Sequence, residues 1–140
     1  MPITCPETDD EILATWSVMA QLRPHLPRDE YVATVRGMMK SDGYKLAALV
    51  DDGVVRAVAG YRFMHMLYCG KLLYVDDLVS DETARSRGYG KQMMDWLKTE
   101  ARDNGCSELQ LISRVTREQA HRFYFREGLA IECFEFRVKL

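Results

Sequence analysis

The sequence predicts an α/β (α+β) fold, in which a mixed central sheet of six to seven strands is flanked by four helices. Three strand patterns, at 45–50, 54–67 and 71–79, follow one another with short turns between them. Strands joined by tight turns pair antiparallel. A helix pattern then separates the strand at 71–79 from one at 108–112, and such crossovers join parallel strands. We therefore expect the order β-α-α-β-β-β-α-β-α-β, with helices on both faces.

The N-terminal third supplies a short strand and two helices. Residues Ile3–Cys5 form a possible edge strand, and Thr8–Glu11 have the spacing of a capping box. Apolar residues recur at helical spacing over 12–20, until Pro24 breaks the pattern. A second helix is expected over 29–40.

Turn and cap residues mark the boundaries of the later elements. Asp51–Gly53 predict a hairpin, and Gly60 within a strand predicts a bulge or a close approach. Gly105 is expected at the C′ position of the crossover helix. Thr116–Gln119 have capping-box spacing before another helix, and residues 130–138 are read as a last strand of mixed alternation.

Length and composition indicate a globular protein. A chain of 140 residues is expected to form a single domain over 1–140. The net charge of −2 predicts no general attraction to nucleic acid or to a membrane. The four cysteines lie far apart without a C-x-x-C pair, so we expect no metal site. No leader or long apolar segment is evident, and we expect a cytoplasmic protein with reduced thiols.

The loop at 85–91 joins the end of a strand to the start of a helix. The first turn of a helix has unpaired N–H groups and attracts anions. Two glycines let an anion approach the backbone, and three cationic side chains add positive charge. The spacing fits neither a P-loop nor a dinucleotide-binding turn. The loop therefore resembles a phosphate cradle, and an ordinary glycine-containing loop is the alternative.

Charge along the chain agrees with such a cradle. Residues 85–126 contain 9 Lys and Arg against 5 Asp and Glu, whereas residues 1–84 contain 8 against 13. This asymmetry suits a polyanionic cofactor and a cationic substrate.

Three segments resemble the GNAT superfamily of N-acetyltransferases. Arg85-x-x-Gly88-x-Gly90 matches the family signature [QR]-x-x-G-x-[GA]. Asp76-Asp77-Leu78-Val79-Ser80 has the form of the preceding strand, and residues 120–129 are similar to the family's A-x-x-F-Y-x-x-x-G-[FLM] segment. The order and spacing agree over most of 72–130. One departure is Arg117, where many members carry Asn.

The resemblance implies acetyl-CoA as co-substrate and no metal. It places the pyrophosphate on the loop and the pantetheine arm along the end of the strand, where the backbone N–H of Leu78 would polarise the thioester carbonyl. The acceptor would be a small-molecule amine or a protein lysine or N-terminus, attacking directly in a ternary complex. The alternative is a non-catalytic acyl-CoA sensor or assembly module on the same fold. The implied cofactor-binding residues are Leu78, Val79, Ser80, Arg85, Ser86, Arg87, Gly88, Tyr89, Gly90 and Lys91.

Two catalytic residues are implied. Neighbours on a strand point to opposite faces, so only one of Asp76 and Asp77 is expected to face the cleft, and the family's spacing favours Asp76. It would accept the amine proton or attract a cationic amine; an ordinary ion pair is the alternative. Tyr124 would protonate the leaving thiolate, the alternative being packing against Phe123. No histidine-based triad is recognisable. Apolar residues on the last predicted strand would support a homodimer.

Overall fold

The computed structural model describes residues 2–140, which contain five strands and five α-helices. Two compact units are present: the first ends at Gln110, and the second comprises Leu111–Leu140. None of the helices in residues 2–140 is long and apolar enough to cross a membrane.

The sheet has the strand order β1-β2-β3-β4-β5, and three of its pairings, β1 with β2, β2 with β3 and β3 with β4, are antiparallel. The elements are β1 (Ile3–Thr4), α1 (Asp9–Ala14), α2 (Trp16–Leu22), α3 (Arg28–Asp42), β2 (Lys45–Asp51), β3 (Val54–Met66), β4 (Gly70–Ser80), a 3₁₀ turn (Glu82–Ala84), α4 (Tyr89–Asp103), β5 (Glu108–Leu111) and α5 (Glu118–Arg126).

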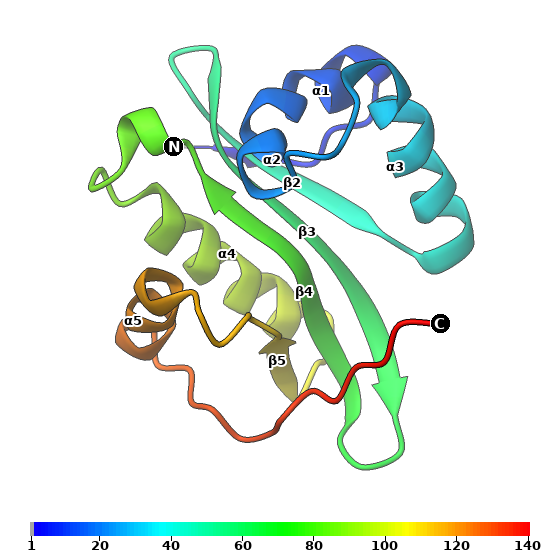
Figure 1. Cartoon of the computed structure of the whole chain (residues 1–140), viewed down its shortest axis with the longest axis vertical. Helices are drawn as coiled ribbons and strands as arrows, with labels where there is room; N and C mark the ends of the chain where they lie inside the picture. Colours follow the sequence, from blue (N-terminus) through cyan, green and yellow to red (C-terminus); the bar gives the residue numbers. More distant parts are fainter. Residues whose placement is uncertain (1) are drawn as a thin grey trace. The chain divides into compact units, whose positions relative to one another are not determined.

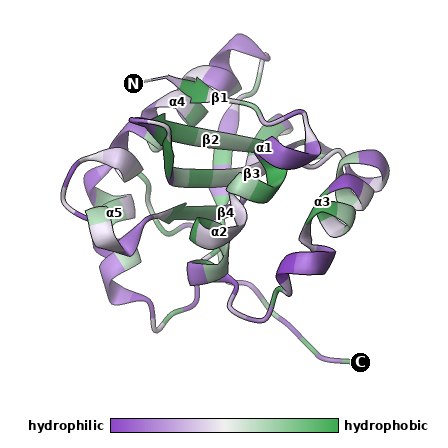
Figure 2. Cartoon of the chain, turned by 90° about the horizontal axis from the view of Figure 1, so that it is seen from above, coloured by the Kyte–Doolittle hydropathy of each residue, from purple (hydrophilic) through white to green (hydrophobic). Residues whose placement is uncertain are grey.

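Helices cover both faces of the sheet in the first unit (Figure 1). On one face, Ile12, Val18 and Val35 of α1–α3 pack with Leu46 and Val58 of the sheet. On the other face α4 buries its own apolar residues, and the ring of Trp96 meets that of Tyr61 edge-on, with centroids 5.8 Å apart. Hydrophobic residues run along β2 and β3 between these layers (Figure 2).

The predicted number of strands, six to seven, is wrong, because the described residues contain five. Residues 130–138 form no strand. Their apolar side chains do not keep a period of two: Ile131 and Phe134 are out of phase, and both are exposed. A strand also needs a hydrogen-bonded neighbour to be stable.

The described residues contain five α-helices instead of the predicted four, because the first expected helix is divided at Thr15. The Thr15 hydroxyl donates to the carbonyl of Ile12 (2.7 Å) and shares a hydrogen bond with the hydroxyl of Tyr31 (2.8 Å). Threonine side chains bonded in this way compete with the regular helical pattern.

One predicted capping box is confirmed and the other is wrong. The hydroxyl of Thr8 accepts from the N–H of Glu11 (3.2 Å), whose carboxylate accepts from the N–H of Thr8 (3.1 Å). In contrast, α5 begins at Glu118 with Arg117 as its N-cap and no side-chain cap. A turn in which the N–H of Arg117 bonds the carbonyl of Arg114 (3.1 Å) precedes this helix and displaces the predicted start.

The predicted turns at glycines are confirmed. Asp52 and Gly53 have φ values of 52° and 73°, as a two-residue hairpin turn between β2 and β3 requires. Gly105 has φ 73° directly after the C-cap of α4, and the N–H of Cys106 bonds the carbonyl of Ala101 (2.9 Å).

Gly60 is the site of both a bulge and a close approach. Gly60 pairs with Asp77, and Tyr61 pairs with Val75, so Asp76 is an extra residue in β4. A Cβ on Gly60 would lie 1.8 Å from the Tyr44 hydroxyl and 2.6 Å from Asp77 Oδ2. Glycine is therefore required wherever Tyr44 and Asp77 keep these positions.

Gly60→Ala is expected to reduce the free energy of unfolding by about 1–3 kcal/mol, because the added carbon forces Tyr44 and Asp77 apart. Urea unfolding measures this difference. Gly37→Ala is the control: Gly37 lies within α3 with no neighbour near the added carbon, so a gain of about 0.5–1 kcal/mol is expected. Equal or greater stability of Gly60→Ala would contradict the close approach.

Candidate active site

The end of β4 directs backbone groups away from β3. The N–H of Asp81 bonds the carbonyl of Arg56 (2.8 Å), in line with the register that pairs Ser80 with Ala57. Hydrogen-bonded and non-hydrogen-bonded pairs alternate in an antiparallel ladder. The N–H groups of Leu78 and Ser80 therefore point to the opposite edge of β4.

That edge is only partly occupied by β5. The N–H of Ser107, just before β5, bonds the carbonyl of Lys71 (2.9 Å) near the start of β4. With α4 as the crossover, β5 runs in the same direction as β4. Because β5 has 4 residues and β4 has 11, β5 ends before the Leu78–Ser80 segment.

The loop at 85–91 forms an open turn at the N-terminus of α4. Ser86 and Gly88 adopt left-handed conformations, with φ of 72° and 79°, and Gly88 is the N-cap of α4. The first backbone hydrogen bond of the helix runs from Gln92 N–H to the Gly88 carbonyl (3.0 Å). Gly88 has no side chain that could cap this end, and the first turn of the helix contains no acidic residue. Arg85 and Arg87 are exposed beside it.

Two residues of the loop have structural partners. Tyr89 is buried, and its hydroxyl donates to Asp51 Oδ2 (2.6 Å) at the end of β2, which fixes the first turn of α4 against the sheet. The ammonium of Lys91 lies 3.0 Å from Asp95 Oδ2 one turn along the helix. The other sequence-predicted residues in this part are Val79, which pairs with Val58, and Gly90, the second residue of α4.

Asp81, which the sequence analysis missed, fixes the start of the connection from β4 to the loop. Its carboxylate accepts hydrogen bonds from Thr83 N–H (3.1 Å), Gln21 Nε2 (3.2 Å) and Arg56 (3.3 Å). These bonds lower the pKa of Asp81. The sequence indicates this role only through the position of Asp81, two residues before Thr83, where an aspartate can cap a turn.

The bulge places both Asp76 and Asp77 on one face of the sheet. Arg62 and Gly60 are two residues apart on β3 and so share a face; Arg62 binds Asp76 through Nε (3.1 Å) and Nη2, and Asp77 lies over Gly60. The expectation that only one of the two carboxylates faces this side is therefore wrong. The extra residue breaks the alternation on which it depended.

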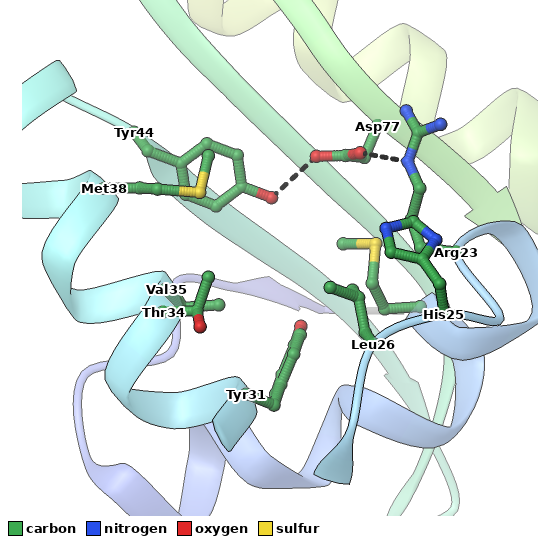
Figure 3. Close-up of a pocket in the computed structure, with 10 residues that line it drawn as sticks. Arg23, His25, Leu26, Tyr31, Thr34, Val35, Met38, Tyr44 and Asp77 are labelled. Carbon is green, nitrogen blue, oxygen red and sulfur yellow. Dashed lines mark hydrogen bonds and ion pairs between the residues drawn. The ribbon is translucent and has the colours of Figure 1, made fainter. Parts of the chain in front are cut away.

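The two carboxylates have different surroundings. Burial raises the pKa of Asp76, while the bound Arg62 opposes the rise. Asp77 accepts from Arg23 Nε (2.9 Å) and from the Tyr44 hydroxyl (2.9 Å). A cavity of about 170 Å³ lies beside Asp77, between α2, α3 and the segment that joins them (Figure 3). Arg23 and Tyr44 were missed by the sequence analysis, although Gly60 signalled the crowding at this point.

Tyr124 lies on α5 in the second unit. Its ring meets that of Phe123 edge-on, with centroids 5.7 Å apart. Burial raises the pKa of the Tyr124 phenol, and the neighbouring Arg117 guanidinium opposes this rise. Arg117, the departure from the family pattern, is thus a neighbour of the proposed acid. The histidine His121 bonds Ser113 Oγ (3.2 Å) and the Arg114 carbonyl (2.9 Å), an arrangement without a carboxylate.

Comparisons with known proteins agree with these features. The acetyltransferase (GNAT) family matches residues 9–129. An uncharacterised N-acetyltransferase, YhdJ of Bacillus subtilis, is 32% identical over 129 residues, covering 91% of each chain. An aminoalkylphosphonate N-acetyltransferase of Salmonella typhimurium is 31% identical over 93 residues, which are 66% of this chain and 60% of that protein.

The fold has solved counterparts. The aminoglycoside N-acetyltransferase AAC(6')-Iy, determined in complex with CoA, superposes with a TM-score of 0.81 at 19% identity, covering 99% of this chain and 95% of that one. At this identity the likeness shows the fold alone. The family match and the Bacillus relative go further: the chain belongs to the GNAT acetyltransferase family, and it is an N-acetyltransferase.

Proposed function

We propose that the protein transfers an acetyl group from acetyl-CoA to a primary amine by direct attack in a ternary complex. The observation that carries this proposal is the continuous path from the unpaired edge of β4, at Leu78 and Ser80, to the uncapped first turn of α4. Acetyl-CoA carries a thioester arm and a pyrophosphate. In this proposal the thioester arm binds to the strand edge and the pyrophosphate binds to the start of the helix. The CoA complex of the structural counterpart supports the same cofactor.

The loop at 85–91 would bind the pyrophosphate mainly through its backbone. Unpaired N–H groups and the helix dipole favour an anion at the start of α4. Gly88 and Gly90 allow it to approach, and Ser86 shapes the turn. Arg85 and Arg87 add positive charge, while Lys91 contributes its N–H, since its ammonium contacts Asp95. Tyr89 holds the turn in place.

The end of β4 would bind and activate the thioester. Leu78 and Ser80 direct their N–H groups to the edge that β5 leaves open, and Val79 between them keeps the strand paired to β3. A backbone N–H aimed at the carbonyl oxygen stabilises the charge that develops when the amine attacks.

The amine must lose a proton before it attacks. An alkylammonium with a pKa near 10.4 costs about 4–5 kcal/mol to neutralise at pH 7. Asp76 is the candidate proton acceptor, directly or through water. Its raised pKa makes it a stronger base than an ordinary carboxylate. Tyr124 is the candidate donor to the leaving thiolate, as the family segment implies.

The acceptor is proposed to be a small molecule. A cavity of about 170 Å³ next to Asp77 is similar to the roughly 150 Å³ that accommodate benzene in a protein interior. The aminoalkylphosphonate substrate named for the Salmonella relative supports the same class.

Acetyl-CoA is expected to raise the melting temperature, and NAD and ATP much less. A ligand at a hundredfold excess over its Kd stabilises the native state by about 2.7 kcal/mol. Gly90→Val should abolish this shift by blocking the backbone, whereas Gly37→Val, another glycine within a helix, should retain it. Thermal unfolding monitored by circular dichroism measures both. An unchanged shift in Gly90→Val would show that the pyrophosphate binds elsewhere.

A further inference from the structure

The cavity beside Asp77 combines an apolar interior with one pair of opposite charges. Met19, Leu26 and Met38 contribute apolar side chains, and Arg23 and Asp77 contribute the charges. Figure 3 shows Asp77 between Tyr44 and Arg23, which come from opposite sides. All of these residues belong to the first compact unit.

Buried neighbours hold the carboxylate of Asp77 in place. Asp77 has a side chain only 13% exposed, and Tyr44 is buried. Burial and the charge of Asp77 raise the pKa of Tyr44, so its hydroxyl stays protonated and donates to Asp77. Glycine at position 60 leaves the space that these two side chains occupy. The carboxylate is therefore pre-oriented toward the cavity.

Both charged groups keep hydrogen-bonding capacity. A carboxylate has about four acceptor sites, of which Tyr44 and Arg23 use two. A guanidinium has five N–H donors; Arg23 uses Nε on Asp77 and Nη2 on the carbonyl of Asp76 (3.0 Å). Its side chain is 42% exposed. An ammonium can bind Asp77 while an anion binds the outer N–H groups of Arg23.

Charge balance decides which amine fits. Asp76 is paired with Arg62 and Asp77 with Arg23, so these two ion pairs carry no net charge before the substrate enters. A simple ammonium would leave a net positive charge in a partly buried site, which is costly. An amine that carries its own anion leaves the site neutral and pairs with both charges.

We infer that the acceptor is a short aliphatic primary amine that bears an anionic group. Asp77 binds its ammonium, and Arg23 binds its anion and so determines specificity. This inference rests on the proposed acetyl transfer, and it agrees with the position of Asp77 immediately before Leu78. One residue of a strand spans about 3.4 Å, so an ammonium on Asp77 lies close to a carbonyl polarised by Leu78.

The test compares amines of similar length with and without an anion. We would measure kcat/KM with n-propylamine, 3-aminopropanoate, 2-aminoethylphosphonate and a capped lysine amide; the two anionic amines distinguish a carboxylate from a phosphonate. The wild type should prefer at least one anionic amine by about tenfold or more, since charge-assisted hydrogen bonds are the stronger ones. Arg23→Gln should remove this preference by raising KM for the anionic amines.

Further variants keep the result interpretable. Arg23→Lys should restore part of the preference, and Asp77→Asn should raise KM for every amine. Arg36→Gln, which removes an exposed ion pair with Asp9, should change nothing. Equal turnover of n-propylamine, the lysine amide and the anionic amines would overturn the inference and leave acetyl transfer standing.

A binding measurement separates the inference from the proposed function. An anionic amine should raise the melting temperature of the wild type in the presence of CoA, and it should not do so for Arg23→Gln. If this difference appears without any acetylated product, acetyl transfer to these amines fails and the binding site stands. If neither an Arg23-dependent shift nor a preference in turnover appears, the inference is overturned.

Discussion

Tyr124→Phe is expected to lower kcat for acetylation by about 10²–10⁴-fold, the usual contribution of a positioned general acid. The change removes one oxygen and keeps the ring that packs against Phe123, so the stability of α5 should change little. Affinity for acetyl-CoA should remain within a few-fold, because the proposed contacts of the cofactor are with the backbone of β4 and of the loop at 85–91. Steady-state kinetics with the preferred amine, combined with a direct titration of acetyl-CoA, measure the two effects separately.

Tyr68→Phe is the matched control. Tyr68 is exposed, and its hydroxyl accepts a hydrogen bond from Gln110 in β5. This variant should retain the wild-type kcat. Full kcat of Tyr124→Phe at every pH would show that Tyr124 only packs against its neighbours and that the proton reaches the thiolate from another donor.

Asp76→Asn is expected to lower kcat by about 10²–10⁴-fold if Asp76 is the proton acceptor. A base acts when deprotonated, so the wild-type kcat should rise as the pH increases through the pKa of Asp76 and then level off. Because burial raises this pKa, the rise should lie above the ordinary range of an aspartate. The variant should lose this limb of the pH–rate profile.

Asp77→Asn distinguishes binding from proton transfer. It should mainly raise KM for the amine, since Asp77 is proposed to bind the ammonium. Melting temperatures of both variants show whether Arg62 or Arg23, deprived of its partner, destabilises the fold. An Asp76→Asn variant with unchanged kcat and an intact acidic limb would remove Asp76 from the mechanism.

Local sequence patterns predicted the antiparallel part of the sheet well. The hairpin at Asp52 and Gly53 and the helix end at Gly105 depend on backbone conformations that few residues adopt, so single residues identify them. The capping box at Thr8 depends on two side chains at a fixed spacing, which the sequence also shows. Gly60 was also correctly interpreted, because a glycine inside a strand indicates lost alternation or crowding. The turn before α4 was predicted from the same kind of signal, since Gly88 adopts a left-handed conformation there.

The errors concern interactions between distant residues. The first helix divides because Thr15 bonds Tyr31, sixteen positions away. Both aspartates share a face because β4 has an extra residue opposite Gly60, and the sequence of β4 alone does not reveal which residue is extra. Arg23 and Tyr44 bond Asp77 only because the fold places the end of α2 and the start of β2 beside β4, and these residues are far apart in the sequence. The period-two alternation that would identify a strand is imperfect over 130–138.

Acetyl transfer itself is tested most directly by following both products with a single protein preparation. The protein would be incubated with acetyl-CoA and each amine, CoA thiol would be quantified by a thiol reagent, and the amide would be quantified by mass spectrometry. We predict equal amounts of CoA and N-acetylated amine, formed in proportion to the protein and abolished in Gly90→Val. Binding of acetyl-CoA with no amide from any small-molecule or peptide amine would contradict the account and favour an acyl-CoA-binding module without turnover.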